Sequence, residues 1–248
     1  MEREEVKRIF ALNLHQQKNK TMTNTKNNKQ DKLILKLMAN EPLTKRELII
    51  KGDLNLGETK IASLPEGLEV GGSLSLSKSE ITSLPKNLKV GASLYLYDCK
   101  NITSLPEGLE VGGDLGLSGT NIITLPEGIK IGGRLGLFNT KITSLPKGLE
   151  VGGNLYLRET RNITTLPEGL KVGGNLDLDG CREITSLPEG LEVGGNLDLN
   201  KTTIQSLPEG LKVGGDLFVR YSRLSVYTKK ELQEMIKTGF IKGKYYRK

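Results

Sequence analysis

Apolar residues recur along this chain at a fixed spacing. Between positions 52 and 224 the chain repeats nine times a unit of 20 or 21 residues, close to G-G-x-L-x-L-x-x-[T/S/C]-x-I-T-S-L-P-E-G-L-x-V. The x-L-x-L stretch alternates apolar and polar residues, which is the period of a β-strand with one buried face. Self-similarity at this period is the signature of a solenoid, whose coils bury their apolar side chains against one another.

The repeated positions also predict how the coils stack. Two leucine columns run from Leu54 to Leu217 and from Leu56 to Val219, and stacking them in register gives a parallel sheet with about 4.8 Å between coils. The proline of each unit disfavours helix in the residue before it, so the return path is expected to be extended. The fold class predicted is therefore mainly β: a solenoid of about nine coils with a non-helical convex side.

Short helices are expected to cover both ends of the stack. In "YTKKELQEMIKTGF", Thr228 and Glu231 form a capping box, and Gly239 is a natural stop. Near the other end, "DKLILKLMANEP" predicts a short helix, and Thr44 with Glu47 forms a second capping box.

Four segments follow from these patterns. We expect a disordered polar and basic segment at 1–30, an N-terminal cap at 31–51, the solenoid at 52–224, and a C-terminal helical cap with a basic tail at 225–248. Both Met1 and Met22 could be the native start, and the sequence does not decide between them.

The repeat resembles the leucine-rich repeat family, in its short bacterial class with Leu-Pro in every unit. "GGSLSLSKSEITSLP" follows most of that family's pattern, and the resemblance covers about 52–224. Glycine replaces the first leucine, and Thr, Ser or Cys replaces the asparagine, so we expect a flatter solenoid than the horseshoes of the long helical class. The resemblance implies a binding scaffold, such as the recognition domains of bacterial effectors and the repeat proteins of gut bacteria and their phages, with a host-directed or counter-defence role.

The net charge of +7 sits at the ends of the chain. Residues 1–48 carry 11 basic and 6 acidic side chains, residues 224–248 carry 7 and 2, and the residues between carry 18 and 21. A domain that binds nucleic acid sequence-specifically needs a basic face among its ordered residues, and the repeats lack one. The chain also has no apolar run that could cross a bilayer and no signal peptide, so we expect a cytoplasmic protein that does not bind membranes.

Residues for catalysis or cofactor binding are largely missing. The single histidine, His15, lies in the predicted disordered segment, and the chain has no P-loop or dinucleotide motif. Cys99 and Cys181 occupy equivalent positions four coils apart, too far for a disulfide. "GGNLDLDG" differs from the calcium nonapeptide because Leu176 replaces its third glycine. We therefore expect no enzyme, cofactor or calcium site, although the sequence leaves open whether Asp177, Asp179 and Asp198 bind another cation.

The outward positions of the strands are the candidate functional surface. Aromatic residues gather there although every inward column is already Leu, Ile or Val, and Tyr and Arg on an exposed face are typical of interface hot spots. The alternative interpretation is that these aromatic residues only stabilise the sheet surface by packing across strands. The residues expected to contact a protein partner are Tyr95, Tyr97, Arg134, Phe138, Tyr156, Arg158, Asp177, Asp179, Asp198, Asn200, Phe218, Arg220 and Tyr221. In the repeated stretch "VGGNLDL", Asn175 and Asn196 are also expected to be free to meet a partner.

Two other functions remain possible from the sequence. A carbohydrate or peptidoglycan-fragment binder would stack Tyr95, Tyr97 and Tyr156 on sugar rings and hold hydroxyls with Asp and Asn. An enzyme that uses paired aspartates is the third reading. The sequence names neither the partner, the process nor the oligomeric state.

Overall fold

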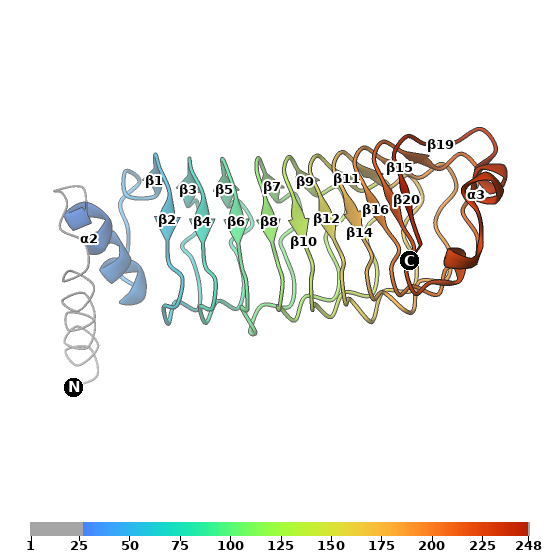
Figure 1. The fold of residues 1–248 in the computed structure, drawn as a ribbon. Helices are drawn as coiled ribbons and strands as arrows, with labels where there is room; N and C mark the ends of the chain where they lie inside the picture. The colour runs from blue at the N-terminus through green and yellow to red at the C-terminus, as the bar shows by residue number, and fades with distance from the viewer. Residues whose placement is uncertain (1–26, 248) are drawn as a thin grey trace.

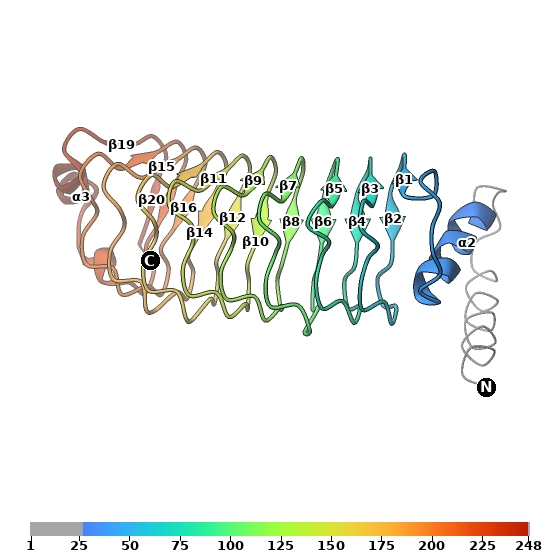
Figure 2. The ribbon, with the colours of Figure 1, turned by 180° about the vertical axis from the view of Figure 1, so that it is seen from behind.

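The computed structural model describes residues 27–247, which form an elongated stack of coils with a helix at each end (Figure 1). Helix α2 (Asn27–Met38) lies at the N-terminal end, and the 3-10 helix η1 (Arg223–Val226) and helix α3 (Lys229–Ile236) lie at the C-terminal end. Seen from either side, the stack runs almost straight, as the flatter solenoid expected from the sequence requires (Figure 2).

Two parallel sheets of ten strands run the length of the stack. Sheet A contains β1 (Ile49–Ile50), β3 (Glu69–Val70), β5 (Lys89–Val90), β7 (Glu110–Val111), β9 (Lys130–Ile131), β11 (Glu150–Val151), β13 (Lys171–Val172), β15 (Glu192–Val193), β17 (Lys212–Val213) and β19 (Phe240–Ile241). Sheet B contains β2 (Leu54–Asn55), β4 (Leu74–Ser75), β6 (Leu94–Tyr95), β8 (Leu115–Gly116), β10 (Leu135–Gly136), β12 (Leu155–Tyr156), β14 (Leu176–Asp177), β16 (Leu197–Asp198), β18 (Leu217–Phe218) and β20 (Tyr245–Tyr246).

The predicted mainly β solenoid is confirmed, and the nine expected x-L-x-L strands are β2 to β18 of sheet B. Leu155 pairs with Leu135 on one side and with Leu176 on the other, so the leucine columns stack in register. Between Ile50 and Ser222 the chain contains no helix, as the prolines predicted. Sheet A was not predicted. The residue pair before each Gly-Gly also forms a strand, and the glycine pair turns the chain from that strand into the strand of sheet B.

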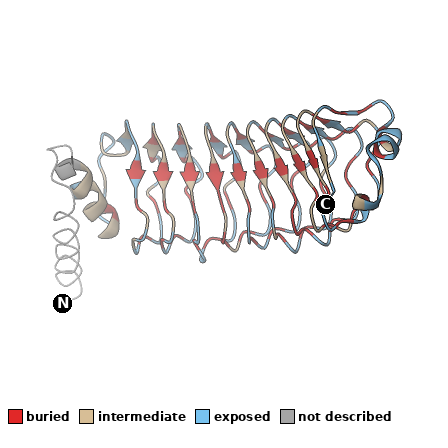
Figure 3. Cartoon of the chain, in the orientation of Figure 1, coloured by how far each residue is buried: buried red, intermediate tan, exposed pale blue. Residues whose placement is uncertain are grey.

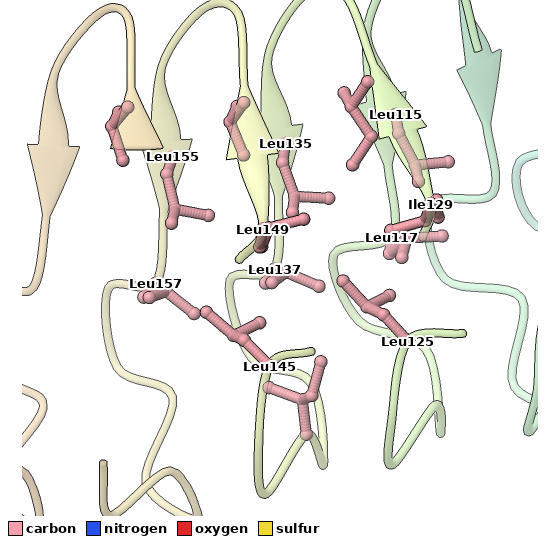
Figure 4. Packing of buried hydrophobic residues seen from close by; sticks show 14 of the residues in the cluster. Leu115, Leu117, Leu125, Ile129, Leu135, Leu137, Leu145, Leu149, Leu155 and Leu157 are labelled. Carbon is pink, nitrogen blue, oxygen red and sulfur yellow. The ribbon is translucent and has the colours of Figure 1, made fainter. Parts of the chain in front are cut away.

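The core is a continuous column of leucine, isoleucine and valine between the two sheets and the return path. Buried residues occur in every coil, whereas the turns are largely exposed (Figure 3). Figure 4 shows Leu115, Leu135 and Leu155 at matching places in successive coils, with Leu117, Leu137 and Leu157 in the next row. All six side chains are completely buried.

The Thr, Ser and Cys column stabilises the turn that follows sheet B, as its position suggested. Thr120 Oγ1 donates to the Leu117 carbonyl at 2.7 Å, and Cys181 Sγ donates to the Leu157 carbonyl at 2.9 Å. Both cysteines are buried free thiols, and burial raises the pKa of Cys181 to about 12. They are therefore structural side chains without the low pKa of a reactive thiol.

The N-terminal cap differs in two ways from its prediction. Helix α2 begins at Asn27, so residues 27–30 are helical where a disordered segment was expected, and Gln30 Nε2 donates to the Asp53 carbonyl at the edge of sheet B. Thr44 and Glu47 make the contacts of a capping box, but they close a single turn and no helix follows. Hydrogen bonds from Lys36 and Thr44 lower the pKa of Glu47 to about 2. His15 and Met22 lie outside the described residues.

The C-terminal cap contains the predicted helix and also an unpredicted coil. Thr228 and Glu231 form the capping box of α3, which buries Leu232 and Ile236. The helix ends at Ile236 and is followed by Lys237, which has a φ of 47°, so it ends before Gly239. The tail then forms β19 and β20 as the tenth strand of each sheet. Gly239 is needed there because a Cβ would lie 2.1 Å from the Leu211 carbonyl oxygen.

Candidate interaction surface on sheet B

The outward face of sheet B presents three columns of side chains, which the x positions of x-L-x-L-x supply. In the first column the side-chain oxygen of one coil accepts the backbone N–H of the next, for example from Ser73 to Asp53 Oδ1 at 2.7 Å. The same contact joins Ser93 and Asp114, Asp114 and Arg134, Asn154 and Asn175, Asn175 and Asn196, Asn196 and Asp216, and Asp216 and Lys244. This column is therefore an internal hydrogen-bond ladder.

The ladder bears on how Asn175, Asn196 and Arg134 are interpreted as contact residues. Asn175 and Asn196 were expected to be free for a partner, and the structure shows instead that their amide oxygens accept backbone N–H groups. Arg134 is exposed and has no side-chain acceptor, so it interrupts the ladder before Asn154. The side chain of Arg134 therefore has no structural role in the ladder and remains a candidate contact residue.

An aromatic group lies on coils three to six of the face. The rings of Tyr95 and Tyr97 stack with their centroids 5.6 Å apart. Tyr97 extends over the next coil, because a Cβ at Gly116 would lie 2.4 Å from its Cζ. Burial against this surface, followed by the charges of Tyr95 and Asp114, raises the pKa of the Tyr97 hydroxyl. The glycine at 116 thus makes room for the ring.

Phe138 and Tyr156 continue the aromatic group on coils five and six. Phe138 is 45% exposed although it is fully apolar. Tyr156 is partly buried, and its hydroxyl accepts a hydrogen bond from Asn154 Nδ2 at 2.6 Å, which fixes the ring. The structure thus holds Tyr97, Phe138 and Tyr156 at set positions on the face, with much of the apolar surface of Phe138 in contact with solvent.

The charged group of the face is built around Asp179. This carboxylate is 7% exposed and lies 3.2 Å from Arg158 Nη2 and 3.1 Å from Lys201 Nζ. Arg158 and Asp179 were expected to contact a partner, and the structure shows that they pair with one another. Lys201 was missed because it follows the third column, in the left-handed position with a φ of 55°.

Asp177 and Asp198 lie opposite each other on β14 and β16. Burial raises the pKa of both carboxyl groups, which each accept a backbone N–H two residues on, from Asp179 and Asn200 respectively. In residues 27–247 no group of three or more His, Cys, Asp or Glu side chains is arranged to hold a metal ion. Arg158 and Lys201 supply the positive charge beside these aspartates.

The C-terminal end of the face combines packed and exposed residues. Phe218 stacks on Tyr246 of the last strand at 4.7 Å with an interplanar angle of 6°, so this predicted contact residue is part of the cap packing. Asn200 Oδ1 accepts the backbone N–H of Arg220 at 2.6 Å. Tyr221 is 84% exposed and adopts a φ of 56°, which a bulky residue rarely does.

Of the predicted site residues, the structure therefore separates those that contact solvent from those that stabilise the face. Arg134, Phe138, Arg220 and Tyr221 are exposed, and Tyr97 is 40% exposed. Asp179, Asn200 and Phe218 have structural partners within the chain. Tyr246 and Lys201 complete the surface, and neither belongs to a column that the repeat pattern identifies.

The comparisons with known proteins add no further assignment. No protein-family model matches the chain, and no curated protein matches it. Within residues 27–247, no helix combines the length and apolar character that a membrane crossing requires.

Proposed function

We propose that this solenoid is a leucine-rich-repeat module that binds a partner protein through the outward face of sheet B, without catalysis or cofactor. The observation that carries the proposal is the aromatic group of Tyr95, Tyr97, Phe138 and Tyr156. The core is complete without these rings, because leucine fills both inward columns of sheet B at this level. Aromatic side chains held on a rigid exposed surface are the usual anchors of protein interfaces.

The charged group supports the same function. Arg158 and Lys201 form ion pairs with Asp179, while the carboxyl groups of Asp177 and Asp198 make this part of the face acidic. A partner with a basic side chain beside an apolar one would match the change from aromatic to acidic along the stack. Such a partner would be a bacterial, phage or host protein met in the cytoplasm, which is where we place this chain.

Affinity purification with mass spectrometry tests the proposal, using the full-length chain as bait. We expect Phe138→Ala together with Tyr156→Ala to lose at least tenfold of the captured partner, because two anchors are removed from the same patch. Ile123→Ala is the matched control, since Ile123 is 49% exposed on the return path and away from this face. A partner that both variants retain equally would contradict the proposal.

The carbohydrate reading remains the alternative function. It requires an aromatic ring with a face open to a sugar, and Phe138 and Tyr97 retain exposed surface. A thermal shift on addition of soluble peptidoglycan fragments, lost in the Phe138→Ala and Tyr156→Ala variant, would favour the glycan function. No shift, combined with capture of a protein, would favour the protein-binding function.

A further inference from the structure

The outward side of sheet A carries one side chain per strand, and these ten side chains form a ridge along the whole stack. We call it the sheet A ridge. In order it consists of Ile49, Glu69, Lys89, Glu110, Lys130, Glu150, Lys171, Glu192, Lys212 and Phe240. Glutamate and lysine alternate strictly over the eight central strands, and an apolar residue stands at each end. Ile49 is 58% exposed and Phe240 is 37% exposed.

Each glutamate of the ridge is bonded to the lysine of the following coil. The distances between Nζ and Oε1 are 2.6 Å for Lys89 and Glu69, 2.7 Å for Lys130 and Glu110, 3.0 Å for Lys171 and Glu150, and 2.7 Å for Lys212 and Glu192. These side chains nevertheless remain between 41% and 75% exposed. Each ridge carboxylate can therefore accept a further hydrogen bond, and each ridge ammonium group can donate one, to a molecule that approaches from solvent.

Two rows of glycine flank the ridge and keep it accessible. On one side, Gly108, Gly128, Gly148 and Gly190 have no atom within 4 Å of where a Cβ would lie. On the other side, the first glycine of each Gly-Gly pair carries no side chain because the carbonyl of the preceding coil is too close; for Gly152 that oxygen is 2.2 Å from the Cβ position. At these positions no side chain stands between the ridge and the solvent beside it.

The ridge of one copy is complementary in charge to the ridge of a second copy that runs in the opposite direction. If a second copy faces the first with its stack antiparallel, strand one meets strand ten and strand five meets strand six. Glu69 then faces Lys212, Lys89 faces Glu192, Glu110 faces Lys171, and Lys130 faces Glu150. At both ends Ile49 faces Phe240, so every position meets its physical complement.

Other registers of two such faces are unfavourable. A parallel arrangement in register, or an antiparallel one shifted by a single coil, places like charges opposite each other along the ridge. A parallel arrangement shifted by one coil restores opposite charges, but it places Ile49 and Phe240 against charged residues and has no closed two-fold symmetry. An antiparallel shift by two coils restores opposite charges but loses the contacts between Ile49 and Phe240. The charge pattern and the two apolar ends together therefore specify one register, and that register has closed two-fold symmetry.

We propose that two copies of this chain associate face to face through the sheet A ridge, with antiparallel stacks and a two-fold axis between β9 and β11. A ridge of ten strands is roughly 45 Å long, and the total buried area is on the order of 1,000 Å², at the low end for specific interfaces. The column beside the ridge limits the affinity, because Glu66, Glu107, Glu127, Glu168, Glu189 and Glu209 outnumber Lys86 and Lys147 there. The dimer is therefore weak, reversible and salt-sensitive.

Charge inversion tests this interface directly. In the inverted variant all eight charged ridge residues are exchanged, Glu to Lys and Lys to Glu, so ion pairs within each copy and complementarity between identical copies are both preserved. Sedimentation equilibrium at about 20 mM salt should show dimers of the wild type and of the inverted variant, and both should dissociate at about 0.5 M salt. A fluorescence-labelled mixture of the two proteins should form at least tenfold fewer mixed dimers, because like charges then face each other in the two-fold register and a shift by one coil, which restores opposite charges, loses both contacts between Ile49 and Phe240.

Mixed dimers that form as readily as matched ones would overturn the proposal, since association through any other face ignores the inversion. A wild type that stays monomeric at 100 µM and low salt would also overturn it. If the inverted variant does not fold, Ile49→Lys serves in its place: the new lysine lies beside Glu69 in its own copy but faces Phe240 of the other. We expect it to weaken dimerisation at least fivefold and to leave capture of a sheet B partner unchanged.

The sheet A dimer and partner binding on sheet B are two proposals that the experiments can contradict independently. Phe138→Ala with Tyr156→Ala should remove the captured partner while the dimer persists, because these residues lie on the other sheet. Retention of the partner by that variant contradicts the proposed function alone, and loss of the dimer in it contradicts the sheet A interface.

Discussion

Asp177 and Asp198 lie opposite each other on β14 and β16, where burial acts against their charged forms. Each carboxylate is half-buried on sheet B, and desolvation raises its pKa above the value expected in the unfolded chain. A raised carboxyl pKa means that the native state binds protons more readily than the unfolded state. The charged forms therefore lower the free energy of unfolding at neutral pH, and this cost disappears as the pH falls through the raised pKa values.

We predict that Asp177→Asn and Asp198→Asn each stabilise the protein at pH 7. Asparagine keeps the Oδ1 acceptor for the backbone N–H two residues on and removes the desolvated charge. The gain should be a few tenths to about 1 kcal/mol, because solvent screens these partly exposed groups, and it should vanish in acid where the aspartates are protonated. Thermal denaturation of both variants and wild type between pH 4 and pH 7 measures it. A loss of stability at pH 7 would show that attraction to Arg158 and Lys201 outweighs desolvation.

The strands depend on glycine for their spacing. Between the sheet A and sheet B strands of a coil, the first glycine of each pair lies so close to the coil before it that no side chain fits. Ala92 shows that the second position of the pair tolerates a methyl group in at least one coil. The corner between the sheets is therefore a packing contact between coils, and this contact explains why glycine recurs there.

We predict that Gly152→Ala destabilises the solenoid by about 1–3 kcal/mol, the usual cost of forcing atoms into a packed site. The added Cβ would lie 2.2 Å from the Gly132 carbonyl oxygen, so β11 and β9 must separate locally. Urea denaturation followed by circular dichroism gives the change. Gly52→Ala is the control, because nothing lies within 4 Å of that Cβ position, and it should change stability by less than about 0.5 kcal/mol. Equal effects of both substitutions would disprove the contact argument.

At the scale of the whole molecule, the charges of the sheet A ridge alternate from coil to coil, so the charge pattern repeats every two coils. Glu192 lies between Lys171 and Lys212, and the same order recurs along sheet A. In a solenoid, stability is close to a sum over coils and the interfaces between neighbours. Removing one coil therefore creates a contact between like charges, whereas removing two adjacent coils does not.

We predict that deleting residues 131–150 and deleting residues 111–150 have different salt dependence. The first deletion places Lys130 beside Lys171, and the second places Glu110 beside Lys171; both junctions keep a native x-V-G-G sequence. Like charges on neighbouring strands cost about 0.2–1 kcal/mol, so added salt should raise the melting temperature of the one-coil deletion relative to the two-coil deletion. Melting curves at several salt concentrations test this, and parallel salt responses would rule out the ridge repulsion.

The candidate surface could be predicted from the sequence only in part. The strand period identified the outward columns, and Tyr97, Phe138 and Tyr221 are exposed as expected. Periodicity does not reveal which outward side chains bond to the next coil, because that depends on the distance between coils. For this reason Asn175 and Asn196 were assigned to a partner although they form a ladder, and Lys201 and Tyr246 were missed.

The amino-acid sequence by itself determined the solenoid, its coil length, its leucine core and the capped C-terminal helix, because each of these follows from local spacing and backbone chemistry that repeat in every unit. Only the tertiary structure decided that the Glu-Val and Lys-Val pairs form a second sheet and that the tail "FIKGKYY" supplies the last strand of each sheet. Two-residue strands have too few positions to show a period, and the tail does not share the repeat. Their pairing depends on the neighbouring coil, which the stacked fold alone brings within hydrogen-bonding distance.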